Sequence, residues 1–259
     1  MSTILFHEIV YGPVHSRRMG VSLGVNLLPY DGKLCSFDCI YCECGFNKDF
    51  RTKTHLPSRE NVKAAMEDKL QSLGKKGVKL DVITFAGNGE PTMHPEFEDI
   101  IEDTVSLRNQ WAPNAKISVL TNGMNVGKAS VFTALKKIEN PILKLDSAFD
   151  KTARLIDRPN SPSYSIAQQV ELYKRFDGDF ILQTMFLKGE FEGTALDNTT
   201  EEEVSAWLRL VEELHPREVM IYTIDRETPA KRLEKTSIET LRKIADRVGE
   251  LGIKTNVAG

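Results

Sequence analysis

The sequence predicts an α/β protein with a parallel β-sheet, organised as a single domain. Short apolar runs of strand length alternate along the chain with longer segments in which apolar residues recur every three or four positions. Six such strand-then-helix units follow one another, and strands joined through helices pair in parallel by right-handed crossovers. Six units are fewer than the eight of a closed barrel. A chain of 259 residues without an internal repeat, a low-complexity tract or a linker is most simply one domain.

The expected elements follow the chain in a regular order. The six strands cover residues 21–28, 80–86, 117–120, 142–145, 180–187 and 218–223, and a short final strand covers 253–257. The helices cover residues 58–73, 96–111, 128–138, 165–176 and 200–214, and a last helix carries an apolar stripe from Leu241 to Leu251. The capping boxes Thr200-x-x-Glu203 and Thr236-x-x-Glu239 predict the starts of the last two helices. The domain thus has an N-terminal segment (1–20), a core (21–223) and a C-terminal helix and strand (224–259).

The segments between these elements carry weaker signals. Residues 43–57 and 154–162 are predicted to be irregular loops, and the polar segment 189–199 is predicted to be a mobile loop. In the N-terminal segment, Arg17 and Arg18 adjoin within a stretch bounded by Gly and Pro. Two adjacent arginines can clamp a carboxylate or a phosphate, and a solvated turn is an equally good interpretation of them.

The overall charge and the apolar runs argue against two classes of partner. The formal net charge is −3, from 34 basic and 37 acidic residues, and no long Lys/Arg block is present. This argues against a nucleic-acid-binding protein held by long-range electrostatics. No apolar run approaches the length of a membrane span, and residues 1–11 lack the basic and apolar regions of a signal peptide. We therefore expect a cytoplasmic protein with no membrane partner.

The strongest chemical signal is the pattern C-x3-C-x2-C formed by Cys35, Cys39 and Cys42, directly after the first predicted strand. Three thiolates this close can bind three corners of a cubane iron–sulfur cluster, because soft sulfur ligands select such clusters over hard cations. The fourth iron then lacks a protein ligand, and an open coordination position marks a reactive metal.

Other uses of these cysteines fit the sequence less well. A zinc site usually draws on a second ligand pair far along the chain, and a disulfide framework needs an oxidising compartment. All four cysteines of this chain lie within residues 35–44. We expect Cys44, the fourth, to be a spare thiol, and a substrate contact or an alternative cluster ligand are the other interpretations.

This cysteine pattern, with the aromatic Tyr41 just before its last cysteine, resembles the signature of radical S-adenosylmethionine (radical SAM) enzymes. The resemblance implies a partial (β/α)6 barrel and two cofactors, a [4Fe-4S] cluster and S-adenosyl-L-methionine (SAM). It also implies that an electron from the cluster cleaves SAM to a 5′-deoxyadenosyl radical, which abstracts hydrogen from a substrate. An external donor such as flavodoxin or ferredoxin would supply the electron, and Tyr41 would lie beside the adenine or the cluster.

A glycine-rich turn after the second predicted strand supports the same family. The turn, residues 87–92, reads Gly-Asn-Gly-Glu-Pro-Thr; its glycines let the backbone approach a ligand closely, and Glu90 can accept a hydrogen bond from an ammonium group. It resembles the radical SAM motif that holds the methionyl amine of SAM, whose usual form is Gly-Gly-Glu. The resemblance implies that the methionyl end of SAM binds to Gly87, Asn88, Gly89 and Glu90.

Polar residues also follow the later strands. Asn122 follows the third strand, Asp146 and Ser147 follow the fourth, and Asp225-Arg226 follows the sixth. A carboxylate and a hydroxyl at a strand end can bond ribose hydroxyls or can merely cap a helix, and functional groups of barrels gather at the C-terminal ends of strands. The resemblance implies a ribose site at Asp146, Ser147 and Asn122, an adenine contact near Tyr222, and substrate anchors among Arg17, Arg18, Arg158 and Arg226. No residue is assigned to the catalytic step itself.

Several segments are similar to the radical SAM branch that contains the tRNA wyosine-base-forming enzymes, among them Ser16-Arg17-Arg18, the cysteine loop and Lys144-Leu145-Asp146-Ser147-Ala148. Those enzymes carry further cysteines for a second cluster, which this chain lacks. Compact relatives include an enzyme that cleaves the 7-deazapurine queuine in base salvage. We therefore expect a lyase or transferase acting on a small purine- or deazapurine-like substrate. The alternatives are tRNA-base modification of the wyosine type and an iron–sulfur electron carrier or sensor, which would usually fill all four iron positions.

Overall fold

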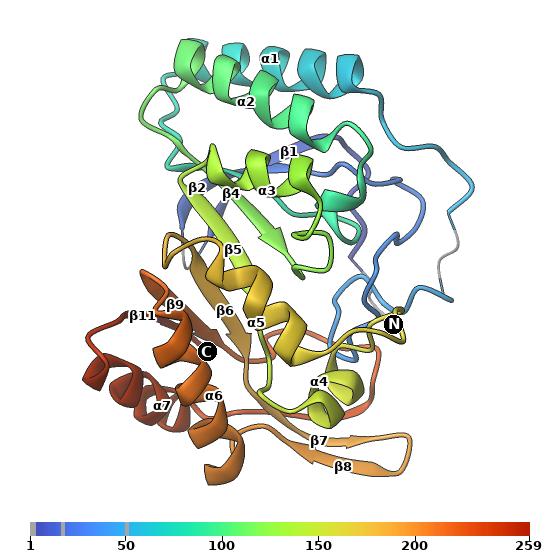
Figure 1. Cartoon of the computed structure of the whole chain (residues 1–259). Coiled ribbons are helices and arrows are strands. Elements are labelled where there is room, and N and C mark those ends of the chain that lie inside the picture. The colour runs from blue at the N-terminus through green and yellow to red at the C-terminus, as the bar shows by residue number, and fades with distance from the viewer. Residues whose placement is uncertain (1–3, 17–18, 50–51) are drawn as a thin grey trace.

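The computed structural model describes residues 4–16, 19–49 and 52–259. Over these residues, eight strands form one sheet in the order β1-β2-β3-β4-β5-β6-β9-β11, in which every neighbouring pair is parallel except β1 and β2. The sheet is curled and carries helices along its outer side, so it forms a half-barrel (Figure 1). The expected α/β class and partial barrel are confirmed.

The elements agree closely with those expected from the sequence. The strands of the large sheet are β1 (Val10–Ser16), β2 (Gly20–Val25), β3 (Val82–Phe85), β4 (Lys116–Thr121), β5 (Asn140–Lys144), β6 (Ile181–Met185), β9 (Glu218–Tyr222) and β11 (Lys254–Ala258). The helices are α1 (Arg59–Lys75), α2 (Phe97–Trp111), α3 (Ala129–Lys136), α4 (Asp150–Ile156), α5 (Ile166–Lys174), α6 (Glu201–Leu214) and α7 (Ile238–Glu250), and a 3-10 turn covers Pro91–Met93. All six expected strands and the short final strand are present.

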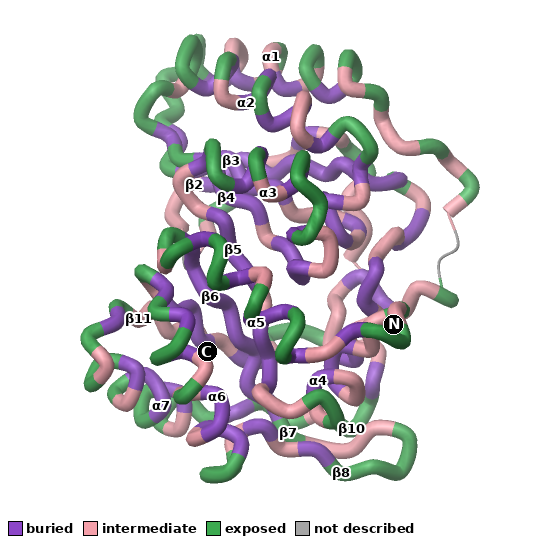
Figure 2. Tube along the Cα trace, viewed as in Figure 1, coloured by how far each residue is buried: buried purple, intermediate pink, exposed green. Residues whose placement is uncertain are grey.

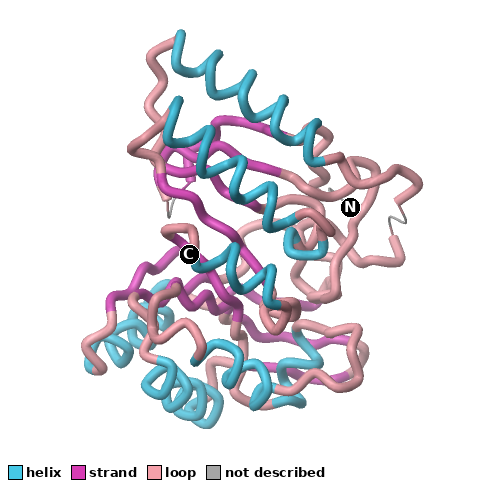
Figure 3. The backbone as a smooth tube through the Cα atoms, turned by 45° about the horizontal axis from the view of Figure 1, so that its top comes forward, coloured by secondary structure: helices cyan, strands magenta, loops and turns pink. Residues whose placement is uncertain are grey.

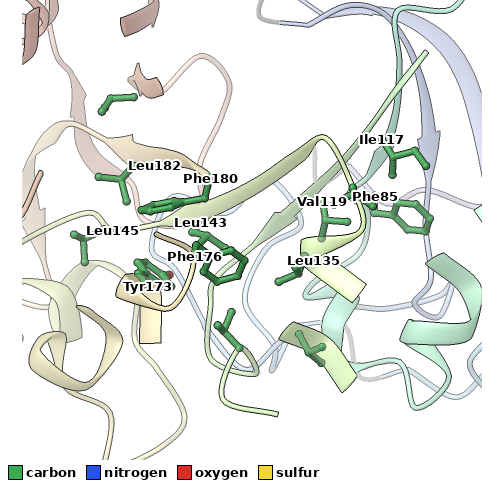
Figure 4. Close-up of a cluster of buried hydrophobic side chains, with 14 of the residues drawn as sticks. Phe85, Ile117, Val119, Leu135, Leu143, Leu145, Tyr173, Phe176, Phe180 and Leu182 are labelled. Atoms are coloured by element: carbon green, nitrogen blue, oxygen red, sulfur yellow. The ribbon is translucent and has the colours of Figure 1, made fainter. Parts of the chain in front are cut away.

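The main hydrophobic core fills the space between the outer face of the sheet and the helices. Leu23 and Val25 of β2 belong to this core, whereas Ser22 and Gly24, which alternate with them, line a cavity on the inner face. Figure 4 shows part of the core, where side chains of β3, β4, β5, α3 and α5 meet. The central strands are buried and the outward faces of the helices are exposed (Figure 2). The inner face therefore remains for polar residues and ligands.

Strand β1 was not expected from the sequence. It pairs antiparallel with β2 and forms one edge of the large sheet. A Cβ atom on Gly24 would lie only 2.1 Å from the ring of Tyr11, so glycine at this position lets the tyrosine ring lie across β2. The tyrosine hydroxyl donates a hydrogen bond to the carbonyl of Ala86 at 2.9 Å. This contact between distant residues, rather than a local pattern, holds β1 against β2.

The polar segment 189–199 is not the mobile loop that we expected. It forms most of a hairpin of β7 (Leu187–Phe191) and β8 (Thr194–Asp197), and β10 (Arg232–Lys235) adds to β7 in a second, three-stranded antiparallel sheet. Glu192 and Gly193 have φ values of 49° and 79°, the positive values that a tight two-residue hairpin turn requires. The apolar side of this small sheet packs on the cysteine loop, where Ile40 and Leu187 share one hydrophobic cluster.

Two further expectations need correction. Helix α7 is capped by Ser237, whose hydroxyl accepts a hydrogen bond from the Thr240 N–H, and not by Thr236. The N–H of Thr236 instead donates to the hydroxyl of Thr223 just beyond β9. The segment 154–162 begins inside α4 and becomes a loop only after Ile156.

Long loops gather at the end of the sheet where the parallel strands finish (Figure 3). None of the helices formed by the described residues has the length and apolar character needed to cross a membrane.

Candidate active site

The cysteine loop connects β2 to α1 and is fixed at the C-terminal end of the strands from two sides. On one side, the N–H of the buried residue Ile40 donates to the carbonyl of Ile156 at 2.9 Å. On the other side, the N–H of Leu34 donates to the carbonyl of Asn88 in the glycine-rich turn, also at 2.9 Å. The two sequence motifs are thus joined by backbone hydrogen bonds, which neither motif alone could reveal.

The three cysteines of the pattern, Cys35, Cys39 and Cys42, are partly buried free thiols. Cys35 Sγ accepts hydrogen bonds from the N–H of Phe37 at 3.4 Å and from the amide of Asn122 at 3.7 Å. Such donors favour the thiolate form that binds metal. In the part of the chain that is described, no three His, Cys, Asp or Glu side chains are grouped as ligands of a single metal ion. Cysteines of a cubane cluster bind separate irons and need not converge on one point.

Cys44 differs from these three. It is buried, and its thiol lies 3.5 Å from the carbonyl oxygen of Gly87. A hydrogen bond from Cys44, helped by the charge of Lys33, lowers the pKa of Cys42 to about 6 against the effect of burial. The same hydrogen bond raises the pKa of Cys44 above its ordinary value. Burial raises the pKa of Cys35 to about 12 and that of Cys39 above its ordinary value, so these shifts do not separate the three predicted ligands from Cys44. The assignment of Cys42 as a ligand and of Cys44 as a spare thiol stays a prediction.

Lys33 was not singled out from the sequence, yet its ammonium group lies inside the cysteine loop. Only 1% of its side chain is exposed, and Nζ donates to the carbonyl of Gly45 at 2.8 Å and to Asp38 Oδ1 at 3.4 Å. Burial acts to lower the pKa of Lys33, but the negative charges of the nearby cysteines and Asp38 raise it above its ordinary value. No local pattern distinguishes this lysine from a surface lysine.

A second buried ammonium group belongs to Lys144, at the end of β5. Its Nζ lies 3.0 Å from Asp157 Oδ1 and contacts both Asp146 Oδ2 and the hydroxyl of Tyr41. The Tyr41 hydroxyl also donates to Asp146 Oδ2 at 2.5 Å. The structure thus brings together two predicted SAM contacts, Tyr41 and Asp146, through a lysine and an aspartate that sequence reasoning missed. The sequence signal that could have revealed this cluster was Lys144, a charged residue at the end of an apolar strand. Lys144 and Asp146 are two positions apart, so in an extended strand their side chains point to the same side.

In the glycine-rich turn, Gly89 has a φ of 137°, and a Cβ atom there would lie 1.9 Å from the carbonyl oxygen of Leu34. Only glycine allows the turn to approach the cysteine loop this closely. The neighbouring Asn88 is fully buried; its side chain bonds the backbone of Phe6 and Pro29, and its own N–H donates to Asn26. Asn88 therefore shapes the turn, and its contact with the methionyl end of SAM stays a prediction.

Glu90 is also buried, and both of its carboxylate oxygens are engaged. Oε1 accepts hydrogen bonds from the hydroxyls of Thr92 and Thr121 at 2.5 and 2.7 Å, and Oε2 accepts the N–H of Asn122 at 2.7 Å. Burial raises the pKa of Glu90 above its ordinary value despite these donors. The carboxylate ties the turn to the end of β4, and its contact with the methionyl amine stays a prediction.

Two predicted ribose contacts, Asn122 and Ser147, form hydrogen bonds with other side chains of the protein. The amide of Asn122 donates to Ser36 Oγ at 2.9 Å, in the cysteine loop. The Ser147 hydroxyl is buried and donates to Glu203 Oε2 of α6 at 2.7 Å. Ser147 therefore anchors α6 and Asn122 supports the cysteine loop, and the ribose contacts of both residues stay predictions. Asp146 is engaged in the same way, because its Oδ1 accepts the N–H of Met185 at 2.9 Å and its Oδ2 meets Tyr41 and Lys144, so its ribose contact also stays a prediction.

Two cavities adjoin the cysteine loop. One has a volume of about 510 Å³ on the inner face of β2 and β3, and its wall includes Phe6, Tyr11, Ser22, Cys44, Thr84 and Gly87. The other has a volume of about 240 Å³, and its wall includes Tyr41, Cys42, Met185, Tyr222, Thr223 and Ile224. The smaller cavity contains both predicted adenine contacts, Tyr41 and Tyr222. Glu43, Asp225 and Arg226 line both cavities.

Two of the four candidate arginines, Arg158 and Arg226, lie among the described residues, and they contact different groups. Arg226 pairs with Glu43 at 2.5 Å where the two cavities meet. Arg158 lies over the ring of Phe191 at 4.9 Å and 3.7 Å from Glu192, in the β7–β8 hairpin, and lines neither of these cavities. A substrate contact by Arg158 stays a prediction. Arg17 and Arg18 lie outside the described residues.

Residues 31–197 match the family model of the radical SAM superfamily, and this match covers more than half of the chain. The chain therefore belongs to the radical SAM superfamily and is an enzyme of that type. A more particular relationship comes from the UPF0026 protein slr1464 of a Synechocystis species, which is 30% identical over 227 residues, covering 86% of this chain and 78% of that protein. The chain thus also belongs to the UPF0026 family.

Other relatives vary in length. The UPF0026 protein MJ1312 of Methanocaldococcus jannaschii is 29% identical, over 91% of this chain and 70% of that protein. A protein named GTPase Obg from Brachyspira hyodysenteriae is 28% identical over 90% of this chain, but the chain spans only 32% of its length.

Solved structures show the same fold at low sequence identity. A radical SAM methyltransferase from Sphaerobacter thermophilus has a TM-score of 0.67 at 16% identity, over 92% of this chain and 65% of that chain. Streptococcus suis SuiB bound to S-adenosylmethionine has a TM-score of 0.63 at 16% identity, over 90% and 50%. TYW1 with a lysine-pyruvate adduct has a TM-score of 0.58 at 14% identity, over 88% and 73%.

The cofactors of this superfamily are a [4Fe-4S] cluster and SAM, and the residues present fit them. Three free cysteines lie in one loop, and N–H donors meet one of their sulfurs. Cys35, Cys39 and Cys42 would hold the cluster, and the smaller cavity beside Tyr41 would receive part of SAM. The bound cofactors supply the electron and the SAM-derived radical for hydrogen abstraction. The contribution of the chain is to bind, orient and shield them.

Proposed function

We propose that this radical SAM enzyme abstracts hydrogen from a small purine- or deazapurine-like substrate in the cytoplasm, with queuine-lyase-like salvage chemistry as the first reaction to test. The observation that carries the proposal is the cavity of about 510 Å³, which has the size of a small-molecule site. Its wall includes Cys44 of the cysteine loop and Gly87 of the glycine-rich turn. A substrate in this cavity would therefore lie beside the loops assigned to both cofactors.

The character of the wall suits a flat heterocycle. Phe6 and Tyr11 stack with ring centroids 4.0 Å apart, and both line the cavity. Aromatic faces attract the faces of nucleobases. Ser22 Oγ and Thr84 Oγ1 lie 2.8 Å apart in the same wall, and hydroxyl groups can both donate to and accept from the polar edge of a base.

Arg226 is the candidate substrate anchor that the structure supports best. It lies where the two cavities meet and pairs with Glu43, with 59% and 41% of the two side chains exposed. An exposed ion pair contributes little stability, at most about 1 kcal/mol. A carboxylate or carbonyl group of a substrate can therefore replace Glu43 as the partner of Arg226 at little cost.

The second candidate function is tRNA-base modification of the wyosine type. The sequence resemblance of the cysteine loop and of Lys144-Leu145-Asp146-Ser147-Ala148 to the branch that contains the wyosine-base-forming enzymes supports it. The acidic net charge and the absence of further cysteines from the sequence oppose it, because tight tRNA binding needs many Lys or Arg contacts to phosphates. Either reaction needs an external electron donor, such as flavodoxin or ferredoxin.

An anaerobic turnover assay separates the two functions. Reconstituted enzyme, dithionite and SAM are incubated in parallel with queuine, related deazapurines and bulk tRNA, and 5′-deoxyadenosine and deuterium transfer from labelled substrate are measured. We expect a free base to raise 5′-deoxyadenosine formation well above the rate without substrate, because the reacting hydrogen must be held beside the radical. Transfer from tRNA but from no free base would refute the small-molecule substrate.

Variants of two arginines test the anchor. Arg226→Gln should raise the KM for the free base about tenfold or more, because a charge-assisted hydrogen bond is worth roughly 1.5–3 kcal/mol. Arg232→Gln is the matched control, since Arg232 lies on β10 and pairs with Glu190 at the surface. Equal KM values for both variants would show that Arg226 does not bind the substrate.

A further inference from the structure

Lys33 is a buried cation with little negative charge from neighbouring carboxylates. Its side chain is 1% exposed, and among the described residues, the carboxylate that pairs with its Nζ is that of Asp38, at 3.4 Å. The oxygen that Lys33 meets, Asp38 Oδ1, also accepts the N–H of Asn47 at 2.7 Å. Burying an ammonium group without a close counter-charge is costly. The protein therefore keeps a charge in this place at some expense of stability.

The other buried lysine of the site shows what full compensation looks like. Lys144 meets two carboxylates, Asp146 and Asp157, and a tyrosine hydroxyl. Its charge is therefore balanced within the protein. The contrast indicates that the counter-charge of Lys33 is supplied by something other than side-chain carboxylates.

The contacts of Lys33 place its ammonium group among the cysteines. Asp38 lies between Cys35 and Cys39 in the chain, and Gly45, whose carbonyl accepts from Nζ at 2.8 Å, lies just beyond Cys42. The ammonium group is therefore bracketed by the segments that carry the cluster ligands. We propose that Lys33 is a permanent counter-charge for the cluster and that it raises the cluster's reduction potential.

The physical reason is electrostatic. Three thiolates and the cluster core carry net negative charge, and reduction adds one more electron. A fixed positive charge close by, in a poorly solvated loop, stabilises the reduced state more than the oxidised state. Lys33 would thereby make the cluster easier for the external donor to reduce. It acts through the cluster and is a positioning residue, not a catalytic one.

The test compares Lys33→Met and Lys33→Arg with the wild type, without any substrate. The reduction potential of the reconstituted cluster is measured by an anaerobic titration followed by electron paramagnetic resonance. Lys33→Met should shift the reduction equilibrium at least tenfold toward the oxidised cluster, a lowering of about 59 mV for one electron. Lys33→Arg should keep the potential near that of the wild type. Lys48→Met removes an exposed lysine of the same loop and should leave the potential unchanged.

The thermal unfolding midpoint of the cluster-free proteins provides the second measurement. We expect Lys33→Met to change it little, because the lost bond to Gly45 is offset by removal of a buried charge. If Lys33→Met folds but fails to take up the cluster while Lys33→Arg takes it up, the counter-charge is supported. Three results would overturn the proposal: an unchanged potential in Lys33→Met, an unfolded cluster-free Lys33→Met, or loss of the cluster in both variants. None of these depends on the substrate proposed above.

Discussion

The ammonium group of Lys144 lies 3.0 Å from the carboxylate of Asp157, and only 10% and 2% of the two side chains are exposed. The lysine ends β5, and the aspartate immediately follows α4. Asp157 Oδ1 also lies 3.6 Å from Cys39 Sγ. This buried pair therefore connects the predicted ribose contact Asp146, which Lys144 also meets, to a predicted cluster ligand.

Removal of Lys144 should destabilise the protein strongly, because Asp146 and Asp157 would be left buried without a cation. We expect Lys144→Met to lose about 3–5 kcal/mol of unfolding free energy in the cluster-free protein. Lys243→Met is the control, since Lys243 pairs with Glu239 at the surface of α7 and should cost less than about 0.5 kcal/mol. Urea unfolding measures both, and equal losses would contradict the assigned role of the buried pair.

The cluster assignment predicts a sharp difference among the four cysteines. Wild-type protein reconstituted without oxygen should hold about four irons and four sulfides per chain, as a cubane requires. Cys35→Ala, Cys39→Ala and Cys42→Ala should each lose the cluster, and Cys44→Ala should retain it. Iron and sulfide analysis measures this. Retention in Cys42→Ala together with loss in Cys44→Ala would show that the third ligand is misassigned.

Gly89→Ala tests the contact between the glycine-rich turn and the cysteine loop. The new Cβ would lie 1.9 Å from the carbonyl oxygen of Leu34, in a backbone conformation that L residues rarely adopt. We expect a loss of at least about 2 kcal/mol and weaker SAM binding. Gly74→Ala, in α1 with no atom within 4 Å of the new Cβ, should instead stabilise by about 0.5–1 kcal/mol. Unfolding midpoints and SAM titration distinguish the two, and a neutral Gly89→Ala would refute the close approach.

The ion pairs that join α1 to α2 should make the stability of the protein depend on pH. Asp103 of α2 accepts from Arg59 at 2.7 Å and from Lys63 at 3.0 Å, and chiefly the bond from Arg59 lowers the pKa of Asp103 below its ordinary value. A carboxyl group with a lowered pKa in the folded state stabilises the fold above its unfolded pKa of about 3.9. That stability is lost as the pH falls through the folded pKa.

Asp103→Asn should therefore cost about 1–2 kcal/mol at pH 7, and the difference from the wild type should shrink below about pH 4. Urea unfolding of both proteins at several pH values measures this difference. If the difference in unfolding free energy stayed constant across that pH range, the ion pairs of Asp103 would not be the source of the difference.

Much of the fold followed from local sequence patterns, and the exceptions have identifiable reasons. The six strands and their helices were expected because apolar period and length are properties of short segments. The β7–β8 hairpin was missed because its residues are largely polar and its support comes from β10 and the cysteine loop, distant in sequence. Strand β1 was missed because the fit of Tyr11 over Gly24 is a pairing between strands.

The sequence by itself determined the type of fold, the three-cysteine loop and the glycine-rich turn, because ligand spacing and periodicity are encoded over a few residues. Only the tertiary structure decided which polar groups bond to one another within the protein. Ser147 and Glu203 are 56 residues apart, and Glu90 and Asn122 are 32 apart, yet both pairs are hydrogen-bonded. Buried polar groups must find partners, and those partners are set by how distant strands and helices pack. For the same reason the buried charges of Lys33 and Lys144 could be recognised only once the chain was folded.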